Sequence, residues 1–259
     1  MKRALLKELR YGLRNSRFLI LFISFFFFAL MTPVMTKVVL PMILQSQFPG
    51  LGEDALAGML DLSQRGSLQS YMGDIFEVGS LIVAFTLCSL LAQELRDNTL
   101  VLPLCSGLRF SHIILAKMIV FGSVLIVLPV AALTASYIYA GLLFSFEIPL
   151  WPVLLGGLLQ GLFMLFLLAC LLLTGALTRK PIVSGITSLV GIYGLYAFGS
   201  LLNWHNYLPT GLLVEAQELA DRPSASLIWP IMITLAVISL FTLLSIIRLH
   251  RLEWQMKTV

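Results

Sequence analysis

The chain has 259 residues, of which 59% are apolar and 12% are charged, and its net charge is +4. Soluble domains have about 45–50% apolar and about 25% charged residues, so the composition excludes an ordinary cytosolic globule. The apolar residues fall into separate blocks of about twenty, which is the length of a membrane span. Because the stretches between the blocks are short, no room remains for a soluble catalytic domain, and any chemistry lies in or beside the bilayer.

Six such blocks predict an all-α polytopic membrane protein with a single transmembrane domain, since backbone groups inside lipid must pair within their own segment. Residues 1–17 mix leucines with lysines and arginines and predict an amphipathic helix in the headgroup layer. A connection is expected at 93–117, and outer segments at 37–74 and 203–226, each with the pattern of a short surface helix. The six spans are expected over 18–36, 75–92, 118–143, 152–177, 182–202 and 227–247.

Lysines and arginines are distributed unequally over the two sides of these spans. All but three of the 17 basic residues fall on one side, in the N-terminal segment, the second and fourth connections and the C-terminal tail. Only Lys37, Arg65 and Arg222 fall on the other side. The positive-inside rule therefore predicts that both termini are cytosolic. The basic residues flank apolar spans and form no continuous stripe, which favours contact with the lipid bilayer over nucleic acid.

Motifs for catalysis are missing from the sequence. It contains no Gly-Lys dipeptide, which excludes a phosphate-binding loop that ends in Lys-Ser or Lys-Thr, so any ATP must be bound by another chain. His112, His205 and His250 are isolated and the three cysteines lack ligand spacing, so we expect no metal site. No Gly-x-Ser-x-Gly elbow is present. The sequence predicts a protein that is not an enzyme and has no cofactor of its own.

Glu77 is an ionisable residue inside a predicted span, and such residues are candidates for function. It lies two residues into the second span, near the outer interface, where a carboxylate reaches water at small cost. Two interpretations stay open: an interfacial residue with no further role, or a contact to a substrate or ion. Deeper in the spans there is no charge, which argues against an ion-coupled secondary carrier.

Small and hydroxyl residues mark faces where helices approach closely. The fourth span has Gly156, Gly157 and Gly161. The fifth span has a longer set: Ser184, Gly185, Thr187, Ser188, Gly191, Gly194, Gly199 and Ser200. These residues are explained either by packing within the chain or by a dimer interface or pathway lining.

The connection between the second and third spans is the most informative stretch. Residues 92–118 read AQELRDNTLVLPLCSGLRFSHIILAKM. This resembles the type-2 permeases of ATP-binding-cassette (ABC) exporters, in which Glu, three residues and Gly-Thr-Leu-Glu-Leu-Leu-Leu-Ser lead through Pro to a final Ile-Leu-x-Gly-Lys. The matching positions, without a gap, are Glu94, Thr99, Leu100, Leu102, Leu104, Leu108, Ile113, Leu115 and Lys117.

Four positions depart from the family pattern. Asn98 replaces a Gly, Pro103 a Leu, Gly107 a Pro and Ala116 the last Gly. Asn tolerates a left-handed turn better than most residues do, so the first replacement is mild. The other departures affect the expected shape of a short helix in this segment but not its location.

The resemblance implies that this segment is a coupling helix that docks in a groove of a separate ABC ATPase subunit. ATP and Mg would act in that partner, and two permease chains, identical or different, would work with two ATPases in the bacterial cell membrane. The residues expected to couple to the ATPase are Glu94, Arg96, Asp97, Thr99, Leu100, Arg109 and Lys117. The second and fifth spans of two protomers would line the path.

An apolar path without buried charge favours export of an amphipathic peptide, drug or lipid. The alternatives are a non-catalytic membrane component of an assembly or maturation complex, and an ion-coupled secondary carrier. Only the permease interpretation requires an ATPase partner, so copurification distinguishes it from the others.

Overall fold

The computed structural model describes residues 2–47, 62–100, 104–105, 107–202, 204, 207–218 and 227–256. Within these ranges the chain is helical and has no β-strand. Six of its helices are long and apolar enough to cross a membrane, and each coincides with one predicted span to within one residue or contains it, which confirms a multi-pass helical membrane protein. The six are Arg17–Ile43, Gln64–Arg96, Phe110–Leu143, Leu150–Thr178, Pro181–Leu202 and Ile228–Arg251.

Two of these helices are divided into several elements. The first consists of α2 (Arg17–Val34), η1 (Met35–Val39) and α3 (Leu40–Gln47), which continues past the end of the span. The second comprises α5 (Gln64–Asp74), η2 (Ile75–Gly79), α6 (Ser80–Leu87) and α7 (Ser89–Arg96). The other elements are α1 (Lys2–Arg14), α9 (Phe110–Leu143), α10 (Leu150–Thr178), α11 (Pro181–Leu202), α12 (Gly211–Glu218) and α13 (Ile228–Met256).

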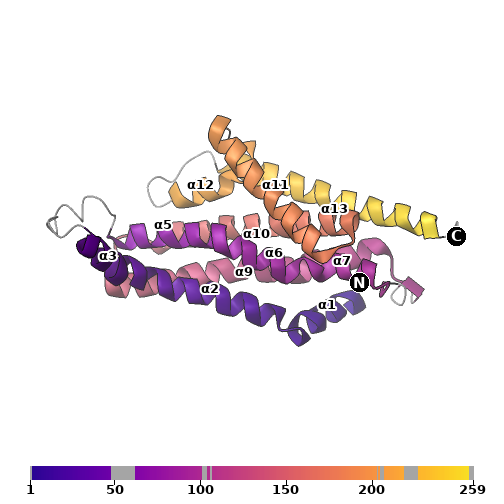
Figure 1. The fold of residues 1–259 in the computed structure, drawn as a ribbon, viewed down its shortest axis with the longest axis horizontal. Coiled ribbons are helices and arrows are strands. Elements are labelled where there is room, and N and C mark those ends of the chain that lie inside the picture. The colour runs from indigo at the N-terminus through magenta and orange to yellow at the C-terminus, as the bar shows by residue number, and fades with distance from the viewer. Residues whose placement is uncertain are drawn as a thin grey trace.

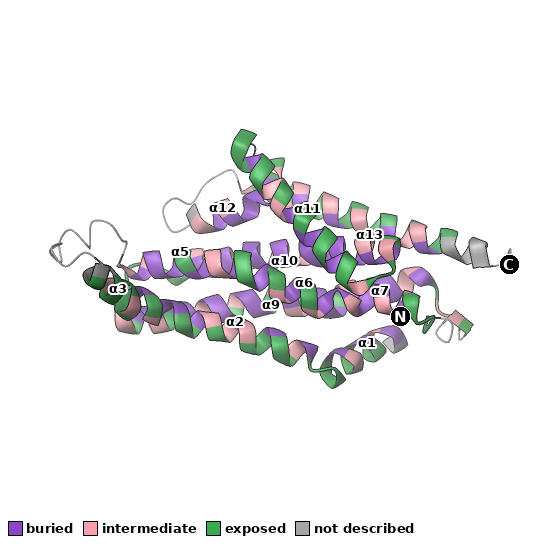
Figure 2. Ribbon diagram, in the orientation of Figure 1, coloured by how far each residue is buried: buried purple, intermediate pink, exposed green. Residues whose placement is uncertain are grey.

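The spans form an elongated bundle with both chain termini at the same end, as an even number of crossings requires (Figure 1). We call this the terminal end; α3, α5 and α12 lie at the opposite end. α10 is the central helix and contacts α6, α7, α9, α11, α12 and α13. Figure 2 shows the buried residues concentrated on the central helices and many exposed residues on α2, α11 and α13. Many of those exposed side chains are large and apolar, as lipid-facing surfaces require.

Glycines permit a close contact between α9 and α10. A Cβ added to Gly157 would lie 2.8 Å from the Val130 Cα, and one added to Gly161 would lie 2.8 Å from the Ile126 Cα. The backbones of α9 and α10 therefore touch at positions that no larger residue can occupy. The close approach predicted for the fourth span is thus confirmed.

The small-residue face of α11 is divided. Ser184, Gly185 and Ser188 are buried, and a Cβ on Gly185 would lie 3.2 Å from the Cys88 Cβ on the second span. Nothing lies within 4 Å of a Cβ placed on Gly191 or Gly194 in the described part of the chain. Packing within the chain accounts for the first part of this face and leaves the second part open.

The helices extend beyond the apolar blocks that the sequence marks. The second span begins at Gln64 rather than 75, and α3 prolongs the first, so much of the expected outer segment 37–74 consists of extensions of the spans. Residues 48–61 lie outside the described part. In the other outer segment, α12 is the expected short helix, and 219–226 are also outside the described part. Hydropathy identifies only the segment inside hydrocarbon, whereas a helix continues wherever its polar side chains find partners.

Two π-helical turns interrupt the spans near the opposite end. η1 follows Pro33 in the first span, and η2 contains Glu77 in the second. The Tyr193 hydroxyl of α11 donates to the Glu77 carbonyl oxygen at 2.8 Å and lies 2.8 Å from the Ser80 Oγ. A π turn disturbs the regular backbone hydrogen bonding of a helix. Here the Tyr193 hydroxyl provides a donor for one carbonyl of the turn, that of Glu77.

Candidate functional site

Four charged side chains meet at the terminal end and form what we call the ion network: Lys7, Glu8, Glu94 and Lys117. The Lys117 Nζ lies 2.9 Å from Glu8 Oε2 and 3.0 Å from Glu94 Oε2. The Lys7 Nζ lies 3.2 Å from Glu94 Oε1 and 3.7 Å from Glu8 Oε1. Each carboxylate is therefore shared by two lysines, and the network joins α1, α7 and α9.

The network is largely removed from solvent. The Lys117 side chain is 0% exposed and that of Glu94 is 10% exposed, whereas that of Lys7 is 41% exposed. A buried cation is costly unless carboxylates compensate it, and Lys117 has two of them. Lys7 forms the accessible edge of the network.

A second set of contacts fixes α1 to the spans. Arg17 Nη2 donates to the Tyr11 hydroxyl at 3.0 Å and to the Ser89 Oγ at 2.8 Å. The Arg17 guanidinium also lies over the Tyr11 ring, 4.7 Å from its centroid, and Lys117 Nζ lies 5.9 Å from the same centroid. Tyr11 is therefore held between two cations, and α1 is tied to the ends of the first three spans.

The segment that follows Glu94 begins with a tight turn. The Asp97 amide donates to the Gln93 carbonyl at 2.8 Å, and the Thr99 amide donates to the Glu94 carbonyl at 3.1 Å. Between them, Asn98 adopts a left-handed conformation with φ 52°. This agrees with the sequence argument that Asn at this position is a mild replacement for Gly. The turn ends α7 directly after the ion network.

The connection between α7 and α9, residues 97–109, joins this turn to the third span. Leu100 is buried, and Gly107 has φ 83°, which favours glycine. Residues 101–103 and 106 lie outside the described part, and the expected short coupling helix falls partly on them. The helices take up more of the expected connection 93–117 than hydropathy suggests, since α7 ends at Arg96 and α9 begins at Phe110.

The structure divides the residues predicted to couple to an ATPase into two groups. Glu94, Leu100 and Lys117 are buried. The other four are exposed to solvent: Arg96, Asp97, Thr99 and Arg109. Glu94 and Lys117 of the first group join α7 to α9. The residues of the second group lie on the solvent-exposed surface beside this contact. Arg96 and Asp97 also pair with each other at 3.1 Å.

Sequence reasoning missed Glu8 and Lys7 as members of this site. Glu8 is the only acidic residue among the first 17 residues, where six lysines and arginines occur. An isolated carboxylate in such a basic segment is a signal that it has a specific partner. The partner, Lys117, lies 109 residues away along the chain, so no local pattern identifies it.

Glu77 lies apart from the ion network, in the η2 turn. Its side chain is exposed, beside the exposed apolar residues Val78 and Leu81. Seventeen residues separate it from Glu94, which places it about 25 Å along the second span toward the opposite end. The structure does not bring Glu77 together with the other predicted residues.

A side groove near the opposite end separates the first two spans. It has a volume of about 490 Å³ and is lined by four apolar residues and two threonines of the first span together with mostly polar residues of α5. Among the described residues that line it, only Asp74 is charged, and its carboxylate accepts a hydrogen bond from the Thr32 Oγ1 at 2.8 Å. The groove thus combines an apolar wall with a carboxylate.

The terminal-end site is an ionic joint between helices. Within the part of the chain that the structure describes, no three His, Cys, Asp or Glu side chains are grouped so that they could hold a metal ion. The joint connects three helices and lies directly beside exposed charged residues. Comparisons with protein family models, curated proteins and solved structures found no match for this chain.

Proposed function

We propose that this protein is the membrane-spanning permease subunit of an ABC exporter of the type-2 class in a bacterial cell membrane. In this proposal the terminal end is cytosolic, and the protein itself catalyses no reaction. ATP and Mg bind to a separate ATPase subunit. The exposed Arg96, Asp97, Thr99 and Arg109 dock on that subunit.

One observation supports the proposal above all: the ion network lies directly beside the exposed connection. A movement of the ATPase that displaces residues 97–109 also displaces α7 and α9, because the ends of these helices are joined through Glu94 and Lys117. α9 has 34 residues and is therefore about 50 Å long, which is enough to cross the whole bilayer. A small displacement of one end therefore tilts the whole helix. Rigid-body tilting of packed helices is a common way to transmit such a displacement.

The distribution of charge and apolar surface supports the orientation. Both termini lie at one end, where most of the basic residues are found, and the positive-inside rule assigns that end to the cytosol. The exposed large apolar residues of α2, α11 and α13 then face lipid or a second permease chain. The amphipathic helix expected at residues 1–17 corresponds to α1, which we place in the cytosolic headgroup layer.

The open part of α11 and the adjacent exposed residues of the second span suit contact with a second permease chain. Gly191 and Gly194 leave space for a close neighbour, and Glu77 and Leu81 lie on the exposed side of the second span. In a dimer formed by these faces, Glu77 would lie near the outer end of the path. The side groove, which contains the Asp74 carboxylate, would receive the positively charged part of an amphipathic peptide, drug or lipid.

The test is copurification of the tagged protein from its native membrane in mild detergent. Glu94 is not substituted in this test, because it is buried against Lys117 and its replacement would disturb folding. We expect a chain with ATPase activity to copurify with the wild type, and its recovery to fall about tenfold or more with Asp97→Lys combined with Arg109→Glu, since like charges at an interface are strongly unfavourable.

The matched control is Arg179→Glu, an exposed residue in the turn between α10 and α11 at the same end. It matches the Arg109→Glu half of the double variant in charge but lies on another connection. We expect the ATPase to be recovered with this variant as with the wild type. Absence of any ATPase from crosslinked native membranes would contradict the proposal and favour a role in an assembly or maturation complex.

A further inference from the structure

α1 has three distinct faces. Residues 4, 8 and 12 are buried against the bundle. Three exposed leucines follow one another on a second face, and three exposed basic residues follow on a third, about 100° away around the helix. The leucines are Leu6, Leu9 and Leu13, and the basic residues are Lys7, Arg10 and Arg14. A helix with adjacent apolar and basic exposed faces suits a position between acyl chains and headgroups.

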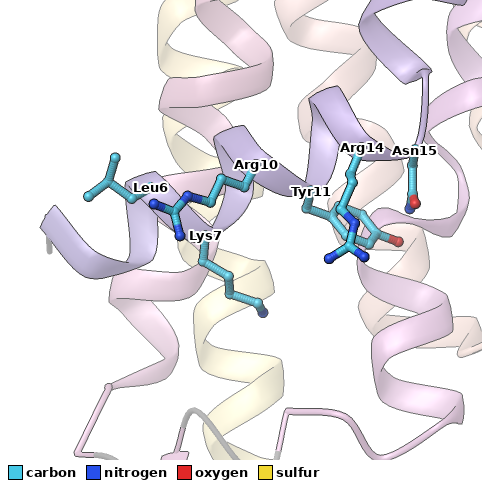
Figure 3. Close-up of a pocket in the computed structure, with 6 residues that line it drawn as sticks. All are labelled: Leu6, Lys7, Arg10, Tyr11, Arg14 and Asn15. Atoms are coloured by element: carbon cyan, nitrogen blue, oxygen red, sulfur yellow. The ribbon is translucent and has the colours of Figure 1, made fainter.

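The basic face borders a hollow of about 760 Å³ (Figure 3). Its lining residues are Leu6, Lys7, Arg10, Tyr11, Arg14 and Asn15. Three of these side chains are cationic and none of the six is acidic. The hollow therefore has the electrostatic character of an anion site, with one apolar residue at its edge.

The cations at this hollow are not all compensated by the protein. Both carboxylates of the ion network are engaged by Lys117 and Lys7. Arg10 and Arg14 have no acidic partner among the residues that the structure describes. Both arginines line the same hollow, where the Arg10 side chain is directed toward Lys7 and the Arg14 side chain lies beside Tyr11 (Figure 3). Guanidinium is the group that binds phosphate in a two-pronged geometry.

We propose that this hollow binds the phosphate headgroup of an anionic phospholipid from the leaflet at the terminal end. Arg10 and Arg14 bind the phosphate, and Lys7 and the Asn15 amide supply further donors. The Tyr11 hydroxyl accepts from Arg17, so its own proton is available to a phosphate oxygen. The adjacent exposed leucines favour a lipid over a soluble phosphate, because the acyl chains of the bound molecule lie along them.

Lys7 connects this site to the ion network. It lines the hollow and also donates to Glu94 Oε1 at 3.2 Å. A phosphate in the hollow competes with Glu94 for the same ammonium group. Occupancy by a lipid is therefore coupled to the contact between α1 and α7.

The test uses the purified full chain in nanodiscs that contain equal amounts of phosphatidylglycerol and phosphatidylcholine with the same acyl chains. Lipids retained by the protein are counted by native mass spectrometry. We expect the wild type to retain phosphatidylglycerol preferentially. Arg10→Gln with Arg14→Gln should lower this preference about fivefold for each arginine removed. Both side chains are exposed, so the fold should persist, and a thermal melt checks it.

The matched control is Arg179→Gln with Lys180→Gln, which removes two exposed charges at the same end but away from the hollow. We expect it to retain phosphatidylglycerol as the wild type does. Equal losses in the two double variants would overturn the proposal, since the preference would then reflect general surface charge. Displacement of the lipid by millimolar glycerol phosphate would also overturn it, in favour of a soluble anion. The nanodiscs contain no ATPase, so failure of the lipid proposal is separate from failure of the permease proposal.

Discussion

The two ends of the bundle are held together by different chemistry. At the terminal end, two lysines and two glutamates join α1, α7 and α9 through side-chain ion pairs. At the opposite end, the turn between α9 and α10 is held by a neutral joint centred on Gln64, which is 0% exposed. The Gln64 Nε2 donates to the Tyr137 carbonyl at 3.1 Å, and its Oε1 accepts from the Glu147 and Ile148 amides at 2.8 and 3.4 Å.

This difference suggests a division of roles. The buried side-chain amide of Gln64 forms its hydrogen bonds with backbone groups in a single arrangement, and these bonds fix the turn between α9 and α10. The ion network has exchangeable partners, because Lys7 lies within reach of both carboxylates and of the hollow. The ionic contacts of the terminal end are suited to transmitting movement between helices. The neutral hydrogen bonds around Gln64 are suited to holding a fixed shape. Substitutions at Lys117, Gln64 and Asn98 test this contrast, with effects that decrease in that order.

The largest effect is expected from Lys117→Met. It leaves Glu8 and Glu94 with only the half-exposed Lys7 as a cation, and breaking such a buried arrangement costs about 3–5 kcal/mol. We expect a large drop in the thermal midpoint of the purified protein in detergent. Adding Glu8→Gln should recover part of the loss, because one uncompensated carboxylate is removed. A Lys117→Met protein as stable as the wild type would show that the network is not a structural joint.

A smaller effect is expected from Gln64→Leu at the opposite end. It removes the hydrogen bonds to three backbone groups and leaves them in a buried site, at a cost of about 1–3 kcal/mol. Hydrogen exchange of the Glu147 and Ile148 amides should accelerate, while exchange at the end of α7 stays unchanged. Gln69→Leu is the comparison, since Gln69 donates to the Gln217 carbonyl and is half-buried. Equal losses of stability in the two variants would contradict a specific role for Gln64.

The smallest effect is expected at Asn98, in the turn after α7. Its left-handed backbone costs most residues about 1–2 kcal/mol, so Asn98→Ala should destabilise the protein by about that amount or less. Asn98→Gly, the residue of the family pattern, should be tolerated, because glycine adopts this conformation freely. Thermal melts of the two variants provide the measurement. A glycine variant less stable than the alanine variant would be inconsistent with a left-handed turn at this position.

The sequence predicted the parts of this structure that depend on local pattern. Six apolar blocks identified the six spans, and the glycines of the fourth span marked a face where another helix approaches closely. The left-handed conformation of Asn98 agrees with the argument that Asn is a mild replacement for Gly at this position. These features were predictable because each depends on residues that are close in the chain.

The ion network and the true helix ends were not predictable in the same way. Hydropathy ended the second span at 92 and began the third at 118, because Glu94 and Lys117 are charged. The helices nevertheless extend past both residues, since each charge is compensated by the other and by Glu8. That compensation depends on contacts between distant parts of the chain. For the same reason the sequence could not show that Glu94 lies inside the joint while Asp97 lies on the surface.

The most direct test of the central proposal uses Cys105, in the connection between α7 and α9. It is exposed, whereas Cys88 and Cys170 are buried, so a maleimide photo-crosslinker should label it selectively in native membranes. We expect irradiation to join it to a chain that contains a Gly-x-x-x-x-Gly-Lys-Ser/Thr loop, and Cys105→Ser to abolish the product. If labelled Cys105 instead gives no adduct with a nucleotide-binding chain, the connection does not dock on an ATPase and the permease proposal is wrong.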